Sequence, residues 1–477
     1  MNTKSIIYQR PYPRIVFKDP DTGETVKTKA GFLEFSTENN KNLISYQFTL
    51  SANDISGSFS LTLYPDYKDK NGTTYSFYDD IKKLQIVEIY ESDGGNNEKP
   101  VFIGIVKRRK YIAQVTDDGG MRRMSVSGYS VAGLVSQFYV NLDTAAIALT
   151  KQLAGDVALS KDLTIQMGSK KNLEVKECIK TIWEYFEKIS SQNGTPKVGE
   201  YIKKFMGDVD NFFDVDDSKF FYPLGCVFNG QQTQDFFSVI DGIIPSPVYE
   251  KFAYADIEKG QMKIKIRTVP FDSDKWSKLK TIVLSPVQVK NIDLEDNDDE
   301  VYTVFYAYLN GYPVDEQKNL ILSTMEAKQD KTLVDSEKYK IYGYRPLIAH
   351  FYGYGLKDGE KDTDSATQMQ KITKKLKEWF GNLPDMLKGS FTLAMNYTNN
   401  LIQPGCKIKF LSGEFYVEGV THSWNYGAGG EINIAVSRGG KYEGGKFKCT
   451  IENLTSILNL LKKGIDPDSK RPITIKR

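Results

Sequence analysis

The fold class is decided by a stretch near the end of the chain, FYVEGVTHSW at residues 415–424. It is followed by the glycine-rich GAGG at 427–430 and by EINIAVSRGG at 431–440. In both longer stretches apolar side chains recur at every second position, which is typical of half-buried strands. Successive side chains of a strand lie on opposite faces, so each stretch predicts one apolar and one polar face. With the glycines between them, the two stretches predict a β-hairpin.

The first part of the chain, residues 1–140, continues this pattern. ISYQFTL (44–50) and SFSLTLY (58–64) alternate, and Ser56-Gly57 is predicted as the turn between them. Further strands are predicted at 87–90, 101–106 and 124–129, and Gly128 is expected to permit a tight turn or a bulge. This regular spacing predicts a barrel or a sandwich for residues 1–140.

The remaining chain predicts α+β parts and a second β block. Residues 141–230 form a helical insertion, because Val175, Ile179 and Ile182 begin an apolar stripe of helical period that continues to Phe186 and Ile189. Residues 231–330 form an α+β middle domain with a helix at 233–240 and strands at 262–267 and 301–306. Residues 331–440 form a second β domain, with a helix capped by Ser365 and Gln368 and strands from 389 to 437. Residues 441–477 form a C-terminal helix and tail.

Composition excludes several classes of function. The 63 basic and 61 acidic residues give a net charge of +2 over 477 residues, so tight DNA binding is not expected. No apolar run is long enough to span a bilayer, so we expect no membrane insertion by this chain. The four cysteines form no CxxC pair and are read as free thiols in a reducing compartment. We expect no metal and no cofactor, because ligand spacings and a P-loop lysine are missing.

Two polar features could suggest catalysis or metal binding. His422 stands beside Ser423, but neighbours on one strand point to opposite faces, so a catalytic pair is not expected. The acidic run at 295–300 lacks the spacing and central glycine of a calcium loop, so a solvated turn is favoured. We therefore expect that the protein is not an enzyme.

Four parts of the sequence resemble the baseplate hub of contractile phage tails and tailocins, the late-control-D-like hub family. They are ISGSFSLTL (55–63), FIGIV with VSGYSVAGL (102–106 and 126–134), IR with PFD (266–267 and 270–272), and VEGVTHSW with SRG (417–424 and 437–439). The residues that carry the resemblance, and are expected to be structural, are Gly57, Phe59, Leu61, Leu63, Gly104, Gly128, Tyr416, Glu418, Gly419, His422, Trp424, Arg438 and Gly439.

The resemblance implies a mainly β, multidomain protein with two tail-tube-like β-barrels, the helical insertion and a smaller α+β domain. It implies a homotrimer that joins the tail tube protein to the central spike and contacts tape-measure and other baseplate proteins. DNA would transit the axial channel without tight binding. The expected location is the virion baseplate or a tail-like particle, assembled in the bacterial host cytoplasm.

The strands near 44–64, 101–106, 391–395 and 415–436 are expected to pair between copies of the chain. Two alternatives stay open. One is a tail-associated cell-wall hydrolase, and the other is a carbohydrate-binding, adhesin-like β protein, which the 12% aromatic content favours slightly.

Overall fold

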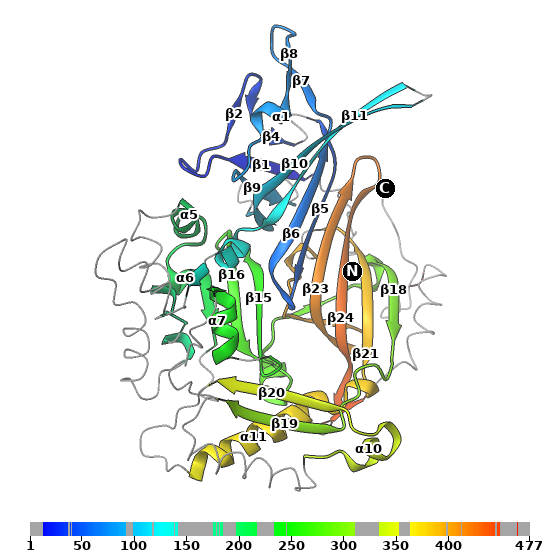
Figure 1. Ribbon diagram of the computed structural model, residues 1–477. Coiled ribbons are helices and arrows are strands. Elements are labelled where there is room, and N and C mark those ends of the chain that lie inside the picture. The colour runs from blue at the N-terminus through cyan, green and yellow to red at the C-terminus, as the bar shows by residue number, and fades with distance from the viewer. Residues whose placement is uncertain are drawn as a thin grey trace, which may run out of the picture.

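The computed structural model describes most of the chain. The described residues are 13–36, 39, 41–91, 99–116, 119–137, 139–141, 175–177, 179–180, 182–184, 197–216, 233–244, 246–310, 333–352, 363–396, 399–411, 413–443, 446–448 and 465. The fold is mainly β, as predicted, and one large sheet runs through its middle (Figure 1).

Strands from both ends of the chain form this large sheet. In spatial order they are β18 (Val289–Glu295), β21 (Leu387–Ala394), β24 (Gly429–Glu443), β23 (Gly413–Asn425), β5 (Leu43–Ser51), β6 (Asp54–Leu63), β11 (Gly119–Ser130), β10 (Phe102–Thr116), β9 (Ile86–Tyr90), β1 (Arg14–Lys18) and β4 (Glu34–Phe35). Off this path, β22 (Lys407–Phe410) pairs with β23 and β17 (Thr281–Val283), and β25 (Lys446–Lys448) pairs with β24.

Smaller sheets surround it. They are β13 (Phe213–Val215), β16 (Gln261–Thr268) and β15 (Tyr249–Asp256); parallel β19 (Val304–Asn310) and β20 (Pro346–Tyr352); β12 (Tyr139–Asn141) with β14 (Thr233–Asp235); β2 (Lys27–Thr28) with β3 (Gly31–Phe32); and β7 (Asp66–Lys68) with β8 (Thr74–Ser76).

The α-helices that have described bounds are α1 (Phe77–Asp80), α5 (Lys197–Met206), α6 (Val209–Phe212), α7 (Phe236–Ile243), α8 (Ser273–Lys278), α10 (Ser336–Tyr342) and α11 (Thr363–Phe380). Short 3₁₀ turns are η1 (Val131–Gln137), η2 (Pro286–Gln288), η3 (Leu383–Asp385) and η4 (Asn399–Leu401). α11 lies beside β19 and β20 at the lower end of the molecule in Figure 1.

The C-terminal hairpin predicted from the sequence is confirmed. β23 and β24 pair antiparallel, with Val420 opposite Ile434, and both side chains are buried. The register shifts between Val417 and Gly419. Such a bulge changes the parity of the strand, so Val417 and Val420 are both buried although they are three residues apart.

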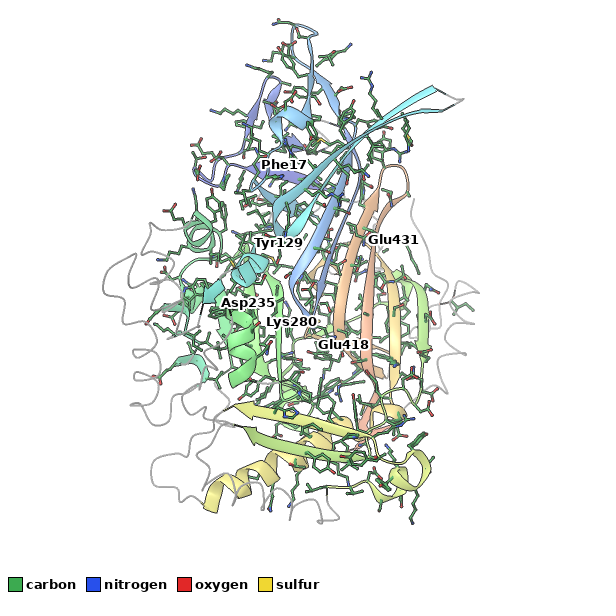
Figure 2. The ribbon with its side chains drawn as sticks, in the orientation of Figure 1. Phe17, Tyr129, Asp235, Lys280, Glu418 and Glu431 are labelled. Atoms are coloured by element: carbon green, nitrogen blue, oxygen red, sulfur yellow. The ribbon has the colours of Figure 1, made fainter. Side chains whose placement is uncertain are left out.

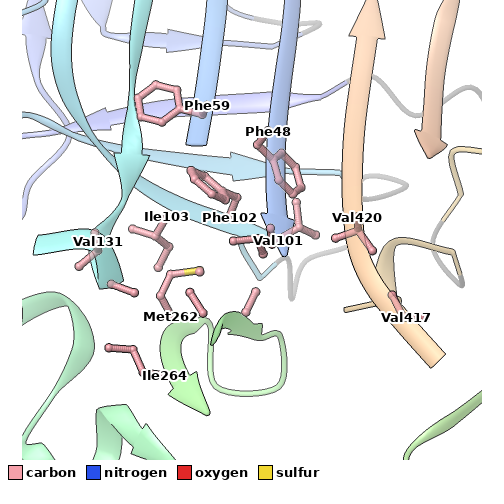
Figure 3. Packing of buried hydrophobic residues seen from close by; sticks show 14 of the residues in the cluster. Phe48, Phe59, Val101, Phe102, Ile103, Val131, Met262, Ile264, Val417 and Val420 are labelled. Carbon is pink, nitrogen blue, oxygen red and sulfur yellow. The ribbon is translucent and has the colours of Figure 1, made fainter. Parts of the chain in front are cut away.

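The apolar face of the sheet is covered by its own far strands and by the middle segment. Phe102 of β10 stacks on Phe48 of β5, with ring centroids 4.9 Å apart, so the sheet curls over itself. Met262 and Ile264 of β16 belong to the same buried cluster (Figure 3). The first β block and the middle segment therefore share one core.

The turn predicted at Ser56-Gly57 is wrong. β5 ends at Ser51 and β6 begins at Asp54, so the reversal lies at residues 52–53. Gly57 lies inside β6 with a φ of +55°, and a Cβ there would lie 2.7 Å from Cδ2 of Leu50. The glycine accommodates a close approach within the hairpin and does not reverse the chain.

The strands expected to pair between copies are already paired within the chain, so that expectation is wrong. β23 pairs with β5, with Thr421 opposite Thr49, and β24 pairs with β21. β6 lies between β5 and β11, and the 102–105 part of β10 lies between β9 and β11. Among the described strands, β18 and β4 are the two ends of this order and each pairs on one side only.

The middle of the chain follows the predictions with shifted bounds. β16 covers the strand expected at 262–267, whereas β19 begins at Val304, three residues later than expected. α7 begins at Phe236 because the side chain of Asp235 caps it by accepting from the amides of Phe237 and Ser238. β17 and β18, from the predicted middle domain, join the large sheet that the two β blocks form. The domain boundaries at 140, 230, 330 and 440 stay a prediction.

The capping box expected at Ser365 and Gln368 is wrong, because both residues lie inside α11. The predicted apolar face of this helix is buried at Ile372, Leu376 and Trp379.

In the predicted helical insertion, residues 175–177, 179–180 and 182–184 are helical, and Val175, Ile179 and Ile182 are buried. Phe186, Ile189 and the C-terminal helix expected at 451–461 lie outside the described residues.

Candidate functional site

The solvent-facing side of the large sheet carries short, neutral polar side chains over seven neighbouring strands. Paired residues of adjacent strands share a face, so the registers trace this surface strand by strand. Its members are Asn291, Ser390, Thr392, Asn433, Thr421, Ser423, Asn425, Ser45, Gln47, Thr49, Ser58, Ser60, Thr62, Ser125 and Ser127. We call these residues the polar face.

Side chains of the polar face bond to one another across strands. The hydroxyls of Thr49 and Thr421 lie 3.0 Å apart, and Asn433 Nδ2 donates to Thr392 Oγ1 at 3.4 Å. Charge lies at the margins of this face. On β18 are Asp293 and Glu295, which faces Lys388 of β21, and Glu431 near the hairpin tip pairs with Lys290 at 2.8 Å. At the other margin, Arg108 and Lys110 of β10 lie opposite Ser127 and Ser125. Figure 2 shows Glu431 and Glu418 toward opposite ends of the same hairpin. An exposed β surface without interspersed lysine and glutamate is unusual for a soluble sheet.

Beneath the polar face, stacked rings connect the two groups of motif residues. Phe59 contacts Phe102 edge-on at 5.9 Å, Phe102 stacks on Phe48, and Phe48 stacks on the imidazole of His422 at 4.4 Å. Trp424 stacks on Tyr46 at 6.2 Å. Residues that lie more than 350 positions apart in the sequence therefore meet at the junction of β5 and β23, which we call the seam.

Two motif glycines make room for this stack. A Cβ at Gly104 would lie 2.7 Å from the rings of Phe59 and Phe102. A Cβ at Gly128 would lie 1.8 Å from the carbonyl oxygen of Ile105. Gly128 lies inside β11, opposite Val106, where β10 shifts register before Arg108. The expected bulge is present in the partner strand, whereas a tight turn at Gly128 is wrong.

The other motif residues of the two β blocks are buried backbone or core positions. Leu61 and Leu63 are buried in β6. Gly419 lies opposite Ser51, and a Cβ there would lie 3.2 Å from the carbonyl oxygen of Leu50.

His422 belongs to a sealed polar cluster. Its Nδ1 lies 2.7 Å from Oε2 of Glu91, and both side chains are fully buried. Tyr46 donates to Oε1 of Glu91 at 2.6 Å, and Asn400 Nδ2 donates to the Glu91 carbonyl at 2.6 Å. Burial and the adjacent Glu91 carboxylate raise the pKa of Tyr46, which keeps the phenol a donor. The cluster ties β5, the end of β9 and β23 together across the seam.

Ser423 does not share this environment. It lies opposite Gln47 on the polar face, while His422 lies opposite Phe48 in the core. The sequence prediction that these neighbours point apart agrees with the register. A histidine and a carboxylate that are both sealed from solvent offer no contact to a substrate, so we interpret the pair as a structural joint.

Tyr416 joins the hairpin to the middle sheet. Its hydroxyl donates to Oε2 of Glu250 at 2.7 Å, and Arg267 donates to Oε1 of Glu250 at 2.5 Å and to the Gly405 carbonyl at 2.7 Å. Burial and the Glu250 carboxylate raise the pKa of Tyr416. A buried arginine needs such partners, and here they lie on three separate segments.

Arg438 makes a second joint. Its guanidinium lies 3.3 Å from the ring centroid of Phe271, and it donates to the carbonyl of Trp379 at 2.5 Å. Its φ is +55°, a strained conformation for arginine. The next residue, Gly439, leaves room for the ring of Phe415, because a Cβ at this position would lie 2.3 Å from that ring.

Glu418 lies beside this joint. Burial raises its pKa, and Ser437 donates to its carboxylate. Tyr416, Glu418 and Arg438 line a cavity of about 1060 Å³. A second cavity of about 870 Å³ lies between β15, β16 and the segment 400–406.

Several expected features can be located. Cys406 is free and buried, and burial raises the pKa of its thiol to about 11; the other three cysteines lie outside the described residues. Within the described ranges, His, Cys, Asp and Glu side chains form no group of three that could hold a metal ion. In the same part of the chain, helices long and apolar enough for a bilayer span are not found. The acidic turn at 295–300 is exposed apart from the half-buried Asn297.

Sequence reasoning missed Glu91, Glu250 and Arg267 as partners of the motif residues, although Arg267 stood within a quoted stretch. Glu91 lies 331 positions from His422, and Glu250 lies 166 positions from Tyr416. No local pattern signals such pairs. An acidic residue directly after the apolar strand IVEIY was the only hint of Glu91.

Comparison with known proteins gives distant structural likenesses. No family model and no curated protein matches this chain. Among solved structures, the tail protein from Neisseria meningitidis MC58 is 12% identical, with 89% of this chain and 96% of that chain covered and a TM-score of 0.46. The 43 kDa tail protein of prophage MuSo2 from Shewanella oneidensis is 16% identical, with 89% and 98% covered and a TM-score of 0.44.

A third likeness is the c3393 protein of E. coli, described as a component of the type VI secretion system with structural similarity to T4 bacteriophage tail proteins. It is 9% identical, with 86% of this chain and 76% of that chain covered and a TM-score of 0.38. These are the kinds of protein that the sequence motifs resemble.

Proposed function

We propose that this chain is a structural baseplate hub of a contractile tail or injection machine. Three copies would form a ring that joins the tail tube to the central spike and encloses the axial channel. The observation that carries this proposal is the polar face, which extends without a break over seven strands taken from both ends of the chain.

A neutral polar face suits a channel wall. Short hydroxyl and amide side chains hold water, but they offer no fixed charge to a passing polyanion and no apolar surface to a passing protein. The apolar side of the same strands is filled by the core that contains Phe48 and His422. The sheet therefore has one side built for burial and one side suited to a wet lumen.

The open strand edges support self-association around an axis. Among the described strands, β18 pairs only with β21, and β10 beyond Val106 pairs only with β11. An unpaired edge is a template for another strand, and two different edges of one chain can meet head to tail in a closed ring. These edges replace the inner strands that sequence analysis had assigned to this contact.

The partners of such a ring follow from its position. We expect the tail tube protein on one side, the central spike on the other, and tape-measure and other baseplate proteins around it. The location would be the virion baseplate or a tail-like particle assembled in the bacterial host cytoplasm. The role is mechanical and not catalytic, because the buried joints of Tyr416, His422 and Arg438 fix segments to one another.

Light scattering on the purified chain tests the proposal. We expect a stable trimer that gives no clearing in a zymogram of peptidoglycan and no retention on a glycan array. A monomer that binds glycan would support an adhesin, and clearing of peptidoglycan would support a hydrolase; either result contradicts the hub.

A further inference from the structure

The hairpin of β10 and β11 extends beyond the body of the sheet as a two-stranded arm, visible at the upper right of Figure 1. β10 pairs with β9 only at 102–105, and β11 pairs with β6 only at 124–128. Among the described residues, 108–116 of β10 pair only with β11, and 119–123 of β11 pair only with β10; we call these two segments the arm. The arm therefore stands at one end of the polar face.

Three cations of the arm lie on the same side as the polar face. Arg108 is opposite Ser127, Lys110 is opposite Ser125, and Arg123 is opposite Ile112, the next position on that face of β10. All three are exposed. Tyr64, which is 56% exposed, directly follows β6 and continues the face of Ser60 and Thr62. We call Arg108, Lys110, Arg123 and Tyr64 the collar.

The opposite side of the arm is different. Arg122 pairs with Asp66 at 3.2 Å, and Arg109 donates to the Tyr78 carbonyl at 2.7 Å and lies over the Tyr78 ring. Those two arginines hold the arm against the body. The collar cations make no ion pair or hydrogen bond within the described part of the chain. Their charge is thus available to a ligand.

We propose that the collar binds the phosphate backbone of nucleic acid at one mouth of the channel. This inference rests on the proposed ring, which would bring three collars together around the axis. Arginine, lysine and tyrosine side chains are the usual phosphate contacts of proteins, and aromatic rings also stack on unpaired bases. The neutral polar face beyond the collar holds no comparable charge, so a strand gripped at the mouth slides once released.

The collar suits nucleic acid better than an acidic protein surface. A protein interface has an apolar core within its polar rim, whereas the collar face offers only the half-buried Ile112 and Met121 beside its cations. Strand geometry repeats Arg108 and Lys110 at every second residue, which presents charge as a row. A row of cations fits a polymer of repeated phosphates, and such contacts bind without reading sequence.

Fluorescence anisotropy with a 20-base-pair duplex and a 20-nucleotide single strand tests the collar over a range of salt concentrations. For the unaltered chain we expect a weak Kd, about 10⁻⁴ to 10⁻⁶ M at physiological salt. The variant Arg108→Gln, Lys110→Gln, Arg123→Gln should bind at least about tenfold more weakly, and its log–log salt slope for duplex should fall by roughly 2.7. The matched control, Lys340→Gln, Lys371→Gln, Lys374→Gln, removes three exposed lysines of α10 and α11 and should leave both values unchanged.

The two DNA probes distinguish the forms of the ligand. If the single strand binds more tightly than the duplex and Tyr64→Ala removes this difference, the collar also stacks on bases. If both probes bind equally, the collar contacts the phosphate backbone alone. Polyglutamate of matched charge that competes as well as DNA would overturn the assignment to nucleic acid, as would unchanged DNA affinity in the collar variant.

Light scattering on the same samples separates the collar from the ring. A collar variant that keeps its DNA affinity but no longer forms trimers would make the arm a subunit contact, and the inference would be wrong while the hub stands. If the unaltered chain is monomeric and the collar variant binds DNA more weakly, the binding site is confirmed and the ring is refuted.

Discussion

At the scale of single residues, His422 could suggest a catalytic histidine from the sequence, but we interpret it as a structural joint between strands. Its imidazole is stacked on Phe48 and lies 2.7 Å from a buried carboxylate that also accepts from Tyr46. Removing one member of such a cluster leaves the others buried without partners, which costs more than replacing the whole cluster by apolar groups.

We expect His422→Ala to lower the free energy of unfolding by about 3–5 kcal/mol, because Oε2 of the buried Glu91 would lose its partner and only Tyr46 would remain on Oε1. The triple variant Tyr46→Phe, Glu91→Leu, His422→Phe should cost less than this single change. Urea denaturation followed by tryptophan fluorescence measures both. As a control, Glu431→Ala removes one partner of an exposed pair and should cost at most about 1 kcal/mol. A triple variant less stable than His422→Ala would contradict the account of the cluster.

At the scale of elements, β10 combines a rigid root with an outer arm. Phe102–Ile105 is paired on both sides, by β9 and β11, whereas residues 109–116 are paired only by β11. Strands that bond on one side and bury few side chains open more readily than those inside a sheet.

Hydrogen exchange followed by mass spectrometry checks this difference within one strand. We expect the amides of 109–114 to exchange faster than those of 102–105 and faster than those of 46–50 in β5, which is paired on both sides. Since the collar cations lie on the arm, addition of the duplex should slow exchange in the arm alone. Equal protection along β10 in the free protein would show that the arm has further contacts.

The elements that sequence predicted well have a strictly local signal. Alternation in SFSLTLY and in EINIAVS gives β6 and β24, because a period of two is set by the strand itself. The predictions at Gly57 and Ser365 were wrong because contacts from outside the local sequence decide the structure there. Glycine and serine favour turns and caps, yet at these positions the close approach of Leu50 and the longer run of α11 decide their surroundings.

At the scale of the whole molecule, the proposed ring depends on a wall without fixed charge. The variant Gln47→Lys, Ser60→Lys, Asn433→Lys places three exposed cations on the polar face of each copy. Nine lysines around the channel would attract phosphate, so DNA ejection from particles assembled with this variant should slow by at least about tenfold.

Ejection rate in an infection assay measures this effect. The matched variant Gln47→Asn, Ser60→Thr, Asn433→Gln keeps the face neutral and should eject DNA at the normal rate. Unchanged ejection in the lysine variant would mean that the polar face does not line the passage.

How the β blocks join could not be read from the sequence. The alternation within each hairpin predicts its strands, but no pattern in either stretch predicts that Thr421 pairs with Thr49. Sequence analysis accordingly treated both strands as open edges. The candidate site was predicted as a set of residues, Phe59, Gly104, His422 and their companions, but not as a seam, because Phe48, Phe102 and Glu91 complete it from other segments.

The seam also sets the order of events during synthesis. Thr49 and Thr421 are separated by 372 residues, and a ribosome adding about 5–20 residues per second needs roughly 20–75 s to cover that interval. Throughout that time the nascent β5 has no β23 to pair with, and the ring of Phe48 lacks the imidazole of His422 that stacks on it. The newborn chain is therefore a natural client for chaperones that shield waiting apolar strands, and ribosomal pausing before codon 415 would prolong that need.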